Sequence, residues 1–478
     1  MQRVDVQNLL DRAKQLHQDG DLDATETLYS AILSKNIVSS GVPWMLSLLG
    51  TLHMERGNNG LAVVLLREAT RGLPTFGEAF NNLGIALARE YVDREADAAY
   101  ATAMERLPTV ADIACNRAGL HINEGRPAKA TEFAGRALAI DSDHGLARWH
   151  MALGRLESGM LNRRTWDFRE ARLISGITRT EVRNYHGTTP TPWWQGESDK
   201  TVVVHGEQGL GDEIMFASCL PHAIQRVGAE RLIFECAPRL QTLFARSFPG
   251  RIVGTNAVDG SALPTDFRPD CKIAVGSLPR LFRPKRSSFP GTPYLKADPV
   301  KVAAARARLP EGRLRIGVSW QGGHHKTRVD LRSLGEPDPP LPILRCDADF
   351  VSLQYTVNAD QQVRDVEANH GVRIHHWPDL LRAQDYDETA ALVASCDVVI
   401  SVYQSVIHLA GALGTPCWVL VPSRPAWRYG IEGNRMPWYG ATVRLFRQGG
   451  DDWASLIERV AGNLADHIRI SRAESKAA

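Results

Sequence analysis

The sequence predicts a multidomain protein in which an all-α repeat array precedes two α/β domains built on parallel sheets. Small residues at helical spacing recur with a fixed period in the first 175 residues. Beyond residue 198, short β-branched or aliphatic runs alternate with helical segments, as in buried parallel strands joined by helices. The length of 478 residues suits about three domains of about 150 residues each.

Composition excludes several classes of protein. The 56 Lys and Arg residues are balanced by 54 Asp and Glu residues, so no global positive field attracts nucleic acid or an anionic membrane. The seven cysteines form no Cys-x-x-Cys pair, which favours reduced thiols over a disulfide framework or a zinc ribbon. The sequence has neither a signal-peptide core nor an apolar run long enough to span a membrane, so we expect a cytoplasmic protein.

The repeat is visible in the small residue of the first helix of each pair. These markers are Ala13, Gly50, Gly84, Ala118 and Ala152, and the last three steps are 34 residues each. Small residues let the two helices of a hairpin approach closely.

Residues around the markers complete a known pattern, with Leu83-Gly84, Tyr100, Ala103 and Pro108 in one repeat. Over residues 5 to 175 the chain resembles the tetratricopeptide family, and we assign residues 1–180 to the array. Such a stack offers an extended surface to another polypeptide. The alternative is an array that only covers the next domain or mediates self-association.

The stretch from His186 to Glu197 is rich in Gly, Pro and Thr and predicts a domain boundary. Six apolar runs after it predict strands, beginning near residues 201, 231, 315, 349, 397 and 417. We place one α/β domain at 198–298 and a second at 313–465, joined through a short charged helix between Pro299 and Pro310. Ligands of such folds bind beyond the carboxyl ends of the strands.

The first loop that could take part in binding or catalysis follows the first predicted strand and leads into a helix. Its glycines, Gly206, Gly209 and Gly211, permit a tight turn and a close approach of the backbone to a ligand. Their spacing matches neither the dinucleotide fingerprint nor a P-loop. Asp212 stands in the first helical turn, where it could take a proton from an attacking hydroxyl or simply cap the helix.

Two motifs in this region carry a resemblance, Trp194-Gln-Gly-Glu and the loop that ends in Gly211-Asp212. The chain resembles bacterial tetratricopeptide proteins with a C-terminal glycosyltransferase domain, whose catalytic half is similar to the ADP-heptose lipopolysaccharide heptosyltransferases. The resemblance covers residues 190 to 465 and implies two Rossmann-like domains in the glycosyltransferase B fold. It also implies an inverting transferase that needs no metal or cofactor, with Asp212 as the base.

A second loop follows the strand near residue 315 and contains Gln321 and a pair of glycines. Beyond them stand Lys326, Arg328 and Arg332, which can neutralise the diphosphate that leaves with the nucleotide. The matching family loop carries basic phosphate-binding residues. The choice among the three cations stays open.

A third loop follows the strand near residue 397 and opens a helix of small residues. Amides around Gln404 and Ser405 can receive phosphate oxygens, with His408 one turn further on. The family counterpart has Asp-Thr where this chain has Tyr403-Gln404. A buried core histidine is the alternative for His408.

Three further residues are predicted to contact the donor. Gln354 ends a strand and Glu388 precedes a helix, at positions suited to the nucleoside, and Arg424 follows the strand that begins near residue 417. The strand ends should bring them toward the same cleft.

Together these features predict a glycosyltransferase that moves a sugar from a nucleotide sugar to a protein acceptor docked on the array. Fused arrays of this kind also resemble flagellin glycosyltransferases, which makes flagellin, with a nonulosonic or similar sugar, a specific acceptor and donor pair. The alternatives are a non-catalytic adaptor with a degenerate transferase domain, which the departure at Tyr403-Gln404 suggests, and a nucleotide-sugar epimerase.

Overall fold

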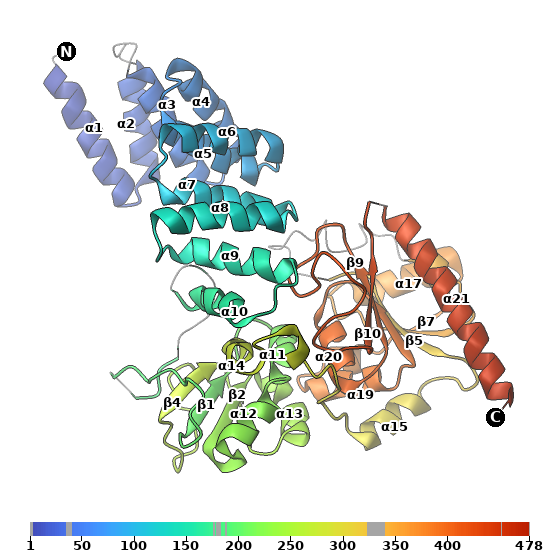
Figure 1. The fold of residues 1–478 in the computed structure, drawn as a ribbon. Helices are drawn as coiled ribbons and strands as arrows, with labels where there is room; N and C mark the ends of the chain where they lie inside the picture. Colours follow the sequence, from blue (N-terminus) through green and yellow to red (C-terminus); the bar gives the residue numbers. More distant parts are fainter. Residues whose placement is uncertain are drawn as a thin grey trace. The chain divides into compact units, whose positions relative to one another are not determined.

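The computed structural model describes residues 3–34, 41–174, 177, 183–186, 189–322, 340–450 and 452–477 (Figure 1). The chain forms two compact units, Met1–Gly154 and Arg155–Ala478. No helix in these described ranges combines the length and the apolar character that a membrane crossing requires.

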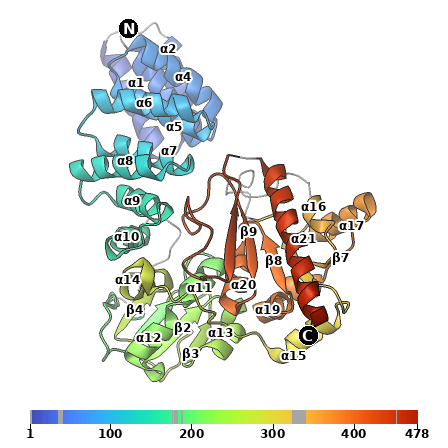
Figure 2. The same cartoon turned by 45° about the vertical axis from the view of Figure 1, so that its right-hand side comes forward.

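The first unit consists of antiparallel helix pairs (Figures 1 and 2). Each pair buries small and aliphatic residues between its helices, and neighbouring pairs stack on one another through the same kind of contact. The chain therefore contains a tetratricopeptide-type repeat region. Its helices are α1 (Arg3–Gln18), α2 (Leu22–Ser34), α3 (Val42–Glu55), α4 (Asn59–Gly72), α5 (Gly77–Arg89), α6 (Asp93–Arg106), α7 (Ala111–Asn123), α8 (Pro127–Ile140) and α9 (Gly145–Glu157), the last of which ends in the second unit.

The predicted small-residue period is confirmed. Four markers lie in the first helix of a pair and the fifth, Ala152, lies in α9; two of them show why a small residue is needed. A Cβ on Gly50 would lie 2.7 Å from Cγ of Leu66, and one on Gly84 would lie 2.6 Å from Cε1 of Tyr100. Both glycines thus allow a bulky side chain of the second helix to pack against the first.

The turns between paired helices need left-handed backbone. Gly57 and Gly125 supply it with φ of +80° and +69°. In the pair α5/α6, Tyr91 takes this role with φ of +61°, an uncommon conformation for a residue with a side chain.

The second unit contains two parallel sheets, as the alternating pattern predicts. The first sheet has four strands in the order β3-β2-β1-β4, and the second has six in the order β10-β9-β8-β5-β6-β7. The six predicted strands are confirmed as β1, β2, β5, β6, β8 and β9. The strands are β1 (Val202–His205), β2 (Leu232–Cys236), β3 (Arg251–Gly254), β4 (Cys271–Ala274), β5 (Arg315–Ser319), β6 (Asp349–Ser352), β7 (Ile374–His375), β8 (Val398–Ser401), β9 (Cys417–Val421) and β10 (Val443–Arg447).

Helices flank both sheets. The long helix α21 covers one face of the second sheet, where Leu456, Val460 and Leu464 join a core that also holds Ile316 and Trp418. The predicted charged helix is confirmed as α15, which Asp298 caps through the backbone N–H groups of its first turn. The helices are α10 (Arg163–Arg169), α11 (Leu210–Ala217), α12 (Leu220–Val227), α13 (Gln241–Ser247), α14 (Leu278–Phe282), α15 (Pro299–Ala307), α16 (Leu341–Leu344), α17 (Ala359–His370), α18 (Pro378–Leu381), α19 (Tyr386–Ala394), α20 (Ser405–Leu413) and α21 (Trp453–Ala477), with 3-10 turns η1 (Glu170–Leu173), η2 (Ala229–Arg231), η3 (Pro238–Leu240), η4 (Val275–Ser277) and η5 (Arg286–Ser288).

Helix α10 belongs to the second unit, although the sequence places it in the array. Trp166 donates from Nε1 to the carbonyl oxygen of Arg283 at 2.8 Å. Arg172, just after the helix, pairs with the buried Glu207 carboxylate at 2.7 Å. These buried polar contacts attach the segment to the first sheet domain, so the boundary between compact units lies at Gly154 rather than near residue 180.

Candidate active site

Two helix N-termini, one from each sheet domain, meet at the carboxyl ends of the strands. Gly209 caps α11 after β1, and Gln404 caps α20 after β8. A Cβ on Gly211 would lie 3.0 Å from Cδ2 of His408 and 3.2 Å from Cα of Ser405. A side chain at position 211 would require these neighbours to move by a few tenths of an ångström. The structure therefore brings together Gly211, Ser405 and His408, with Gly209 and Gln404 as the residues just before the two helices.

A cavity of about 210 Å³ opens beside this meeting point, and we call it the inter-sheet cavity. The hydroxyl of Tyr386 lies 2.9 Å from Oγ of Ser405, and the Arg239 guanidinium lies 5.3 Å from the centre of the Tyr386 ring. Its walls thus combine aromatic faces, hydroxyl groups, one cation and helix amides, which suit a nucleotide. The lining includes Leu210, Gly211, Arg239, Tyr355, Tyr386 and Ser405.

Asp212 forms an ion pair with Arg428. Nε of Arg428 lies 2.8 Å from Oδ1 of Asp212, and a terminal guanidinium nitrogen contacts the same oxygen. The Arg428 and Asp212 side chains are 21% and 16% exposed, so the pair is shielded but reachable. Burial opposes the charged form of Arg428, yet the Asp212 carboxylate raises its pKa above the ordinary value. Oδ2 of Asp212 makes no hydrogen bond to any described residue, which leaves one oxygen able to accept a proton.

His408 is buried beneath the helix junction. Its Nδ1 lies 2.9 Å from the Tyr439 hydroxyl. Burial lowers the pKa of His408 to about 3, and the nearby Arg428 acts in the same direction. The imidazole is therefore neutral near pH 7. Any contact with a phosphate would be a hydrogen bond from Nε2 rather than an attraction between charges.

The glutamines after β5 and β6 form a hydrogen-bond network. Oε1 of Gln354 accepts from the backbone N–H of Gln321 at 3.2 Å and from the Ser319 hydroxyl. Gln362 donates to Oε1 of Gln321 at 2.8 Å. Gln354 is only 1% exposed, so its place is behind the cavity wall. Its neighbours Leu353 and Tyr355 line the inter-sheet cavity instead.

Tyr403 and Gln404, just before α20, both have contacts within the second sheet domain. The Tyr403 ring stacks on the Tyr429 ring with centroids 4.0 Å apart. Gln404 donates from Nε2 to the Ser401 hydroxyl at 3.1 Å, while its buried Oε1 has no partner among the described residues. That acceptor belongs to the residue that begins α20, where a ligand or water donor could satisfy it.

The remaining predicted residues lie apart from the inter-sheet cavity or are not described. Glu388 pairs with Lys301 at 2.8 Å and is not among the residues that line the cavity. Arg424 is half-buried and lines neither this cavity nor the second one described below. Lys326, Arg328 and Arg332 lie outside the described residues.

A buried arginine missed in the sequence lies behind the ion pair. Arg169 is 1% exposed and donates to the carbonyl oxygen of Gly276 at 2.7 Å. Its guanidinium lies 4.7 Å from the centre of the Phe216 ring and 5.4 Å from that of Trp427. Burial lowers its pKa to about 9, while the field of Asp212 favours its charge. The sequence around Arg169, just before η1, contains no motif that would have marked it as a site residue.

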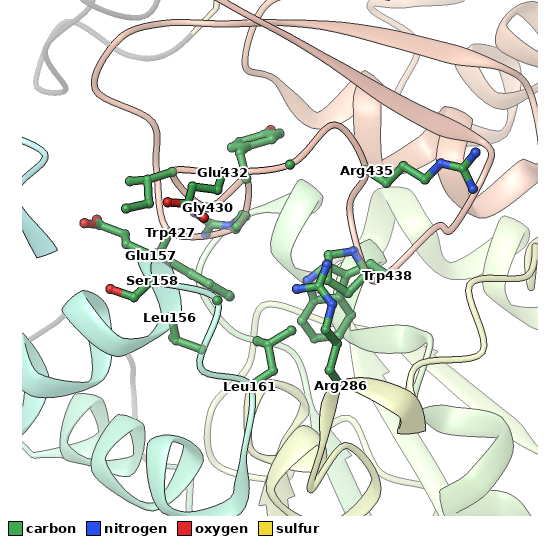
Figure 3. A pocket seen from close by; sticks show the side chains of 16 residues that line it. Leu156, Glu157, Ser158, Leu161, Arg286, Trp427, Gly430, Glu432, Arg435 and Trp438 are labelled. Carbon is green, nitrogen blue, oxygen red and sulfur yellow. The ribbon is translucent and has the colours of Figure 1, made fainter. Parts of the chain in front are cut away.

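A second cavity, of about 400 Å³, also has Arg428 in its wall, and we call it the Glu157 cavity (Figure 3). It is enclosed by the segment 156–161 and by the loop 427–438. Figure 3 shows Glu157 and Ser158 at one side, and Arg286 with Trp438 at the opposite side. No motif in the sequence marks this cavity, because its walls come from segments distant in the chain.

The chain is similar to a curated protein over most of its length and to solved repeat proteins over about a third of it. No family model matches the chain. Protein FlbA of Caulobacter vibrioides is 27% identical over 482 residues, which cover 96% of this chain and 72% of FlbA. A tetratricopeptide repeat protein from Parabacteroides merdae is 17% identical, with a TM-score of 0.32, and its match covers 36% of this chain and 68% of that protein. A second tetratricopeptide repeat protein, from Thermus thermophilus, is 22% identical, with a TM-score of 0.30. The match covers 35% of this chain and 90% of that protein.

Proposed function

We propose that the protein is a cytoplasmic glycosyltransferase of the glycosyltransferase B type, with two Rossmann-like domains. It transfers a sugar from a nucleotide sugar to a protein acceptor held by the repeat array. Flagellin is the specific acceptor that the sequence resemblance suggests. The observation that carries the proposal is the meeting of the α11 and α20 N-termini at Gly211 and Ser405, next to Asp212 and the inter-sheet cavity.

The donor would occupy the inter-sheet cavity. Two helix N-termini expose backbone N–H groups and the positive ends of their dipoles, which favour a diphosphate. Tyr355 and Tyr386 offer aromatic faces for the nucleoside base, and Arg239 adds a positive charge. Lys326, Arg328 and Arg332 supply further cations in our proposal, one or more of which would neutralise the leaving phosphate.

Asp212 would act as the general base. Its Oδ2 accepts the proton of the acceptor hydroxyl while that oxygen forms a bond to the anomeric carbon of the sugar. The bond from the anomeric carbon to the diphosphate oxygen breaks, and the nucleoside diphosphate leaves with the electron pair. Attack from the face opposite the leaving group inverts the configuration at that carbon.

Arg428 would orient this base through Oδ1. A guanidinium that holds one carboxylate oxygen fixes the rotamer of Asp212 and directs the other oxygen toward the acceptor. Held in this way, Oδ2 of Asp212 would stay in place while the new bond to carbon forms.

The test compares wild type with Asp212→Asn, using intact-mass spectrometry of purified flagellin incubated with a panel of nucleotide sugars. We expect the wild type to add one or more sugar masses with at least one donor. The variant should bind that donor with similar affinity and transfer about 10²- to 10⁴-fold more slowly. Unchanged transfer by Asp212→Asn would remove Asp212 from the mechanism.

One observation favours a non-catalytic adaptor as the second candidate. The Asp212 carboxylate is already neutralised by Arg428, and the Tyr403 ring fills a place where the resembled family has Asp. An adaptor would bind a protein partner through the array and would bind no nucleotide sugar. Calorimetric titration with the donor panel separates the two, because only the enzyme needs a donor site. Interconversion of a free nucleotide sugar without any acceptor would instead indicate an epimerase.

A further inference from the structure

The Glu157 cavity contains charged groups that the proposed reaction does not use. Arg286 and Arg435 line it without an anionic or hydrogen-bonded partner among the described side chains. The guanidinium of Arg286 approaches the Gly159 turn, where an added Cβ would lie 3.7 Å from one of its nitrogens. Arg428 adds a third guanidinium, whose contacts with Asp212 use Nε and one terminal nitrogen. The lining of the cavity therefore contains three guanidinium groups.

The lining also contains an unsatisfied acid. Glu157 is 5% exposed, and its Oε2 is buried without a hydrogen-bond partner among the described residues. Leaving a buried polar atom unpaired is costly, so an unpaired one calls for an explanation such as a bound water or ligand. Burial raises the pKa of Glu157 to about 8, so the neutral acid can both donate and accept.

Two buried tryptophans make the cavity rigid. Trp427 stacks on Phe216 at 6.3 Å, and Trp438 packs edge-on against Phe289 at 4.8 Å. Trp427 is also within 5.4 Å of the buried Arg169 guanidinium. Walls held by aromatic contacts of this kind keep their shape when empty, as small binding sites generally do.

We propose that the Glu157 cavity binds an acidic side chain of the polypeptide acceptor, with Arg286 and Arg428 pairing with its carboxylate and Glu157 bonding a neighbouring hydroxyl or amide. This inference rests on the proposed transfer to a protein. Guanidinium groups bind carboxylates in a bidentate manner, and aromatic walls pack on the rest of a side chain.

Two observations favour a polypeptide over a carboxylate on the transferred sugar. The cavity begins at Glu157, the last residue of α9, and α9 starts within the repeat region that would hold the acceptor. The inter-sheet cavity already provides a separate place for the donor. Arg428 belongs to the Glu157 cavity and contacts Asp212, so an acceptor bound there would reach the proposed base.

The experiment measures peptide binding to the full chain by calorimetry at about 150 mM salt, without donor, so that exposed charges are screened. The probes are a short serine peptide with one Glu and the same peptide with Gln in its place. We expect the Glu peptide to bind at least tenfold more tightly. Arg286→Ala should weaken the Glu peptide about tenfold and leave the Gln peptide unchanged.

Lys285→Ala is the matched control, because it removes an exposed cation next to Arg286 that does not line the cavity. It should leave both affinities unchanged. Equal binding of the two peptides, or equal losses in the two variants, would overturn the proposal. Glucuronate binding that depends on Arg286, with no peptide binding, would assign the cavity to a sugar carboxylate and also overturn it.

A negative result for acidic-peptide binding is distinguishable from a negative result for the proposed transferase function. Peptide binding needs neither donor nor turnover, whereas the Asp212→Asn comparison measures transfer. Arg286 is exposed, so Arg286→Ala should keep the fold, and an unchanged melting temperature confirms this.

Discussion

The two cavities of the second unit differ in how their walls are built. The inter-sheet cavity is lined by the starts of α11 and α20, which follow β1 and β8, and by two tyrosine rings, with Arg239 as its cation. The Glu157 cavity is about twice as large and is lined by three arginines, a buried acid and two tryptophans from loops distant in the sequence. The position of the inter-sheet cavity thus follows from the fold topology, whereas the Glu157 cavity is distinguished by the charged and aromatic side chains in its wall.

The Asp212–Arg428 ion pair links them. Asp212 follows Gly211, a wall residue of the inter-sheet cavity, and Arg428 lines the Glu157 cavity. A ligand in either cavity would therefore lie close to the same pair. This arrangement is what a two-substrate reaction requires, and substitutions that affect one cavity or both can test it.

Arg428→Ala should have the largest effect, because it removes a group that lines the Glu157 cavity and also contacts Asp212. Loss of the charged hydrogen bonds to Asp212 should lower the free energy of unfolding by about 1.5–3 kcal/mol. Without Arg428 to orient it, Asp212 should act less effectively as the base, and sugar transfer should slow by about 10²-fold. Chemical denaturation and the mass-based transfer assay measure the two effects.

Arg435→Ala is its control, since Arg435 lines the Glu157 cavity without contacting Asp212. It should leave the stability unchanged. Equal losses in the two variants would show that the ion pair has no special role.

Gly211→Ala should disturb the inter-sheet cavity alone. Its new Cβ, at 3.0 Å from His408 and 3.2 Å from Ser405, would push α11 and α20 apart. We expect a loss of about 1–3 kcal/mol in stability and about tenfold in donor affinity. Gly209→Ala is the comparison, because its Cβ meets nothing within 4 Å and its backbone is extended. If both variants bind donor like the wild type, the close approach of the helices does not shape the site.

Glu157→Gln should change the pH dependence of stability. Because the folded chain holds the Glu157 proton up to a pKa of about 8, against an ordinary value of 4.5, it binds more protons than the unfolded chain between these values. Stability from this group therefore falls as pH rises from about 4.5 to about 8. Relative to the wild type, the variant should gain up to about 5 kcal/mol across that window.

Melting curves from about pH 5 to about pH 9 measure this pH dependence of stability. Glu458→Gln, at an exposed position on α21, is the control. Parallel pH profiles for wild type and Glu157→Gln would mean that Glu157 is ionised in the folded protein.

Tyr386→Phe should have the smallest effect. It removes the hydroxyl that lies 2.9 Å from Ser405, a single hydrogen bond worth about 0.5–1.5 kcal/mol. Tyr355→Phe, in the same cavity, should leave stability unchanged. Denaturation curves of the two variants give the difference directly, and an equal response would contradict the contribution of the Tyr386 hydroxyl.

The sequence was most informative where one local rule decides the structure. The small-residue period located the helix pairs, and aliphatic runs located the central strands, because burial on both faces demands such residues. It missed β3 and β10, in which exposed or half-buried arginines interrupt the apolar pattern, and β4, which contains the buried Lys272. It also missed β7, which is only two residues long.

The predicted site shows the same division. Loops after β1 and β8 could be found from their glycines and helix starts, and they do meet at Gly211 and Ser405. The partnership of Asp212 with Arg428 joins residues 216 positions apart, and no local pattern reports such a contact. Arg169, Arg286 and Glu157 are likewise ordinary in the sequence and become notable only through burial or a missing partner.

The central claim is that the inter-sheet cavity binds a nucleotide sugar. Calorimetric titration of the full-length protein with a panel of nucleotide sugars tests it most directly, with Gly209→Ala and Gly211→Ala measured in parallel. We predict saturable one-to-one binding of at least one donor, retained in Gly209→Ala and weakened about tenfold in Gly211→Ala. Absence of binding for every donor, or binding that Gly211→Ala leaves unchanged, would contradict the account.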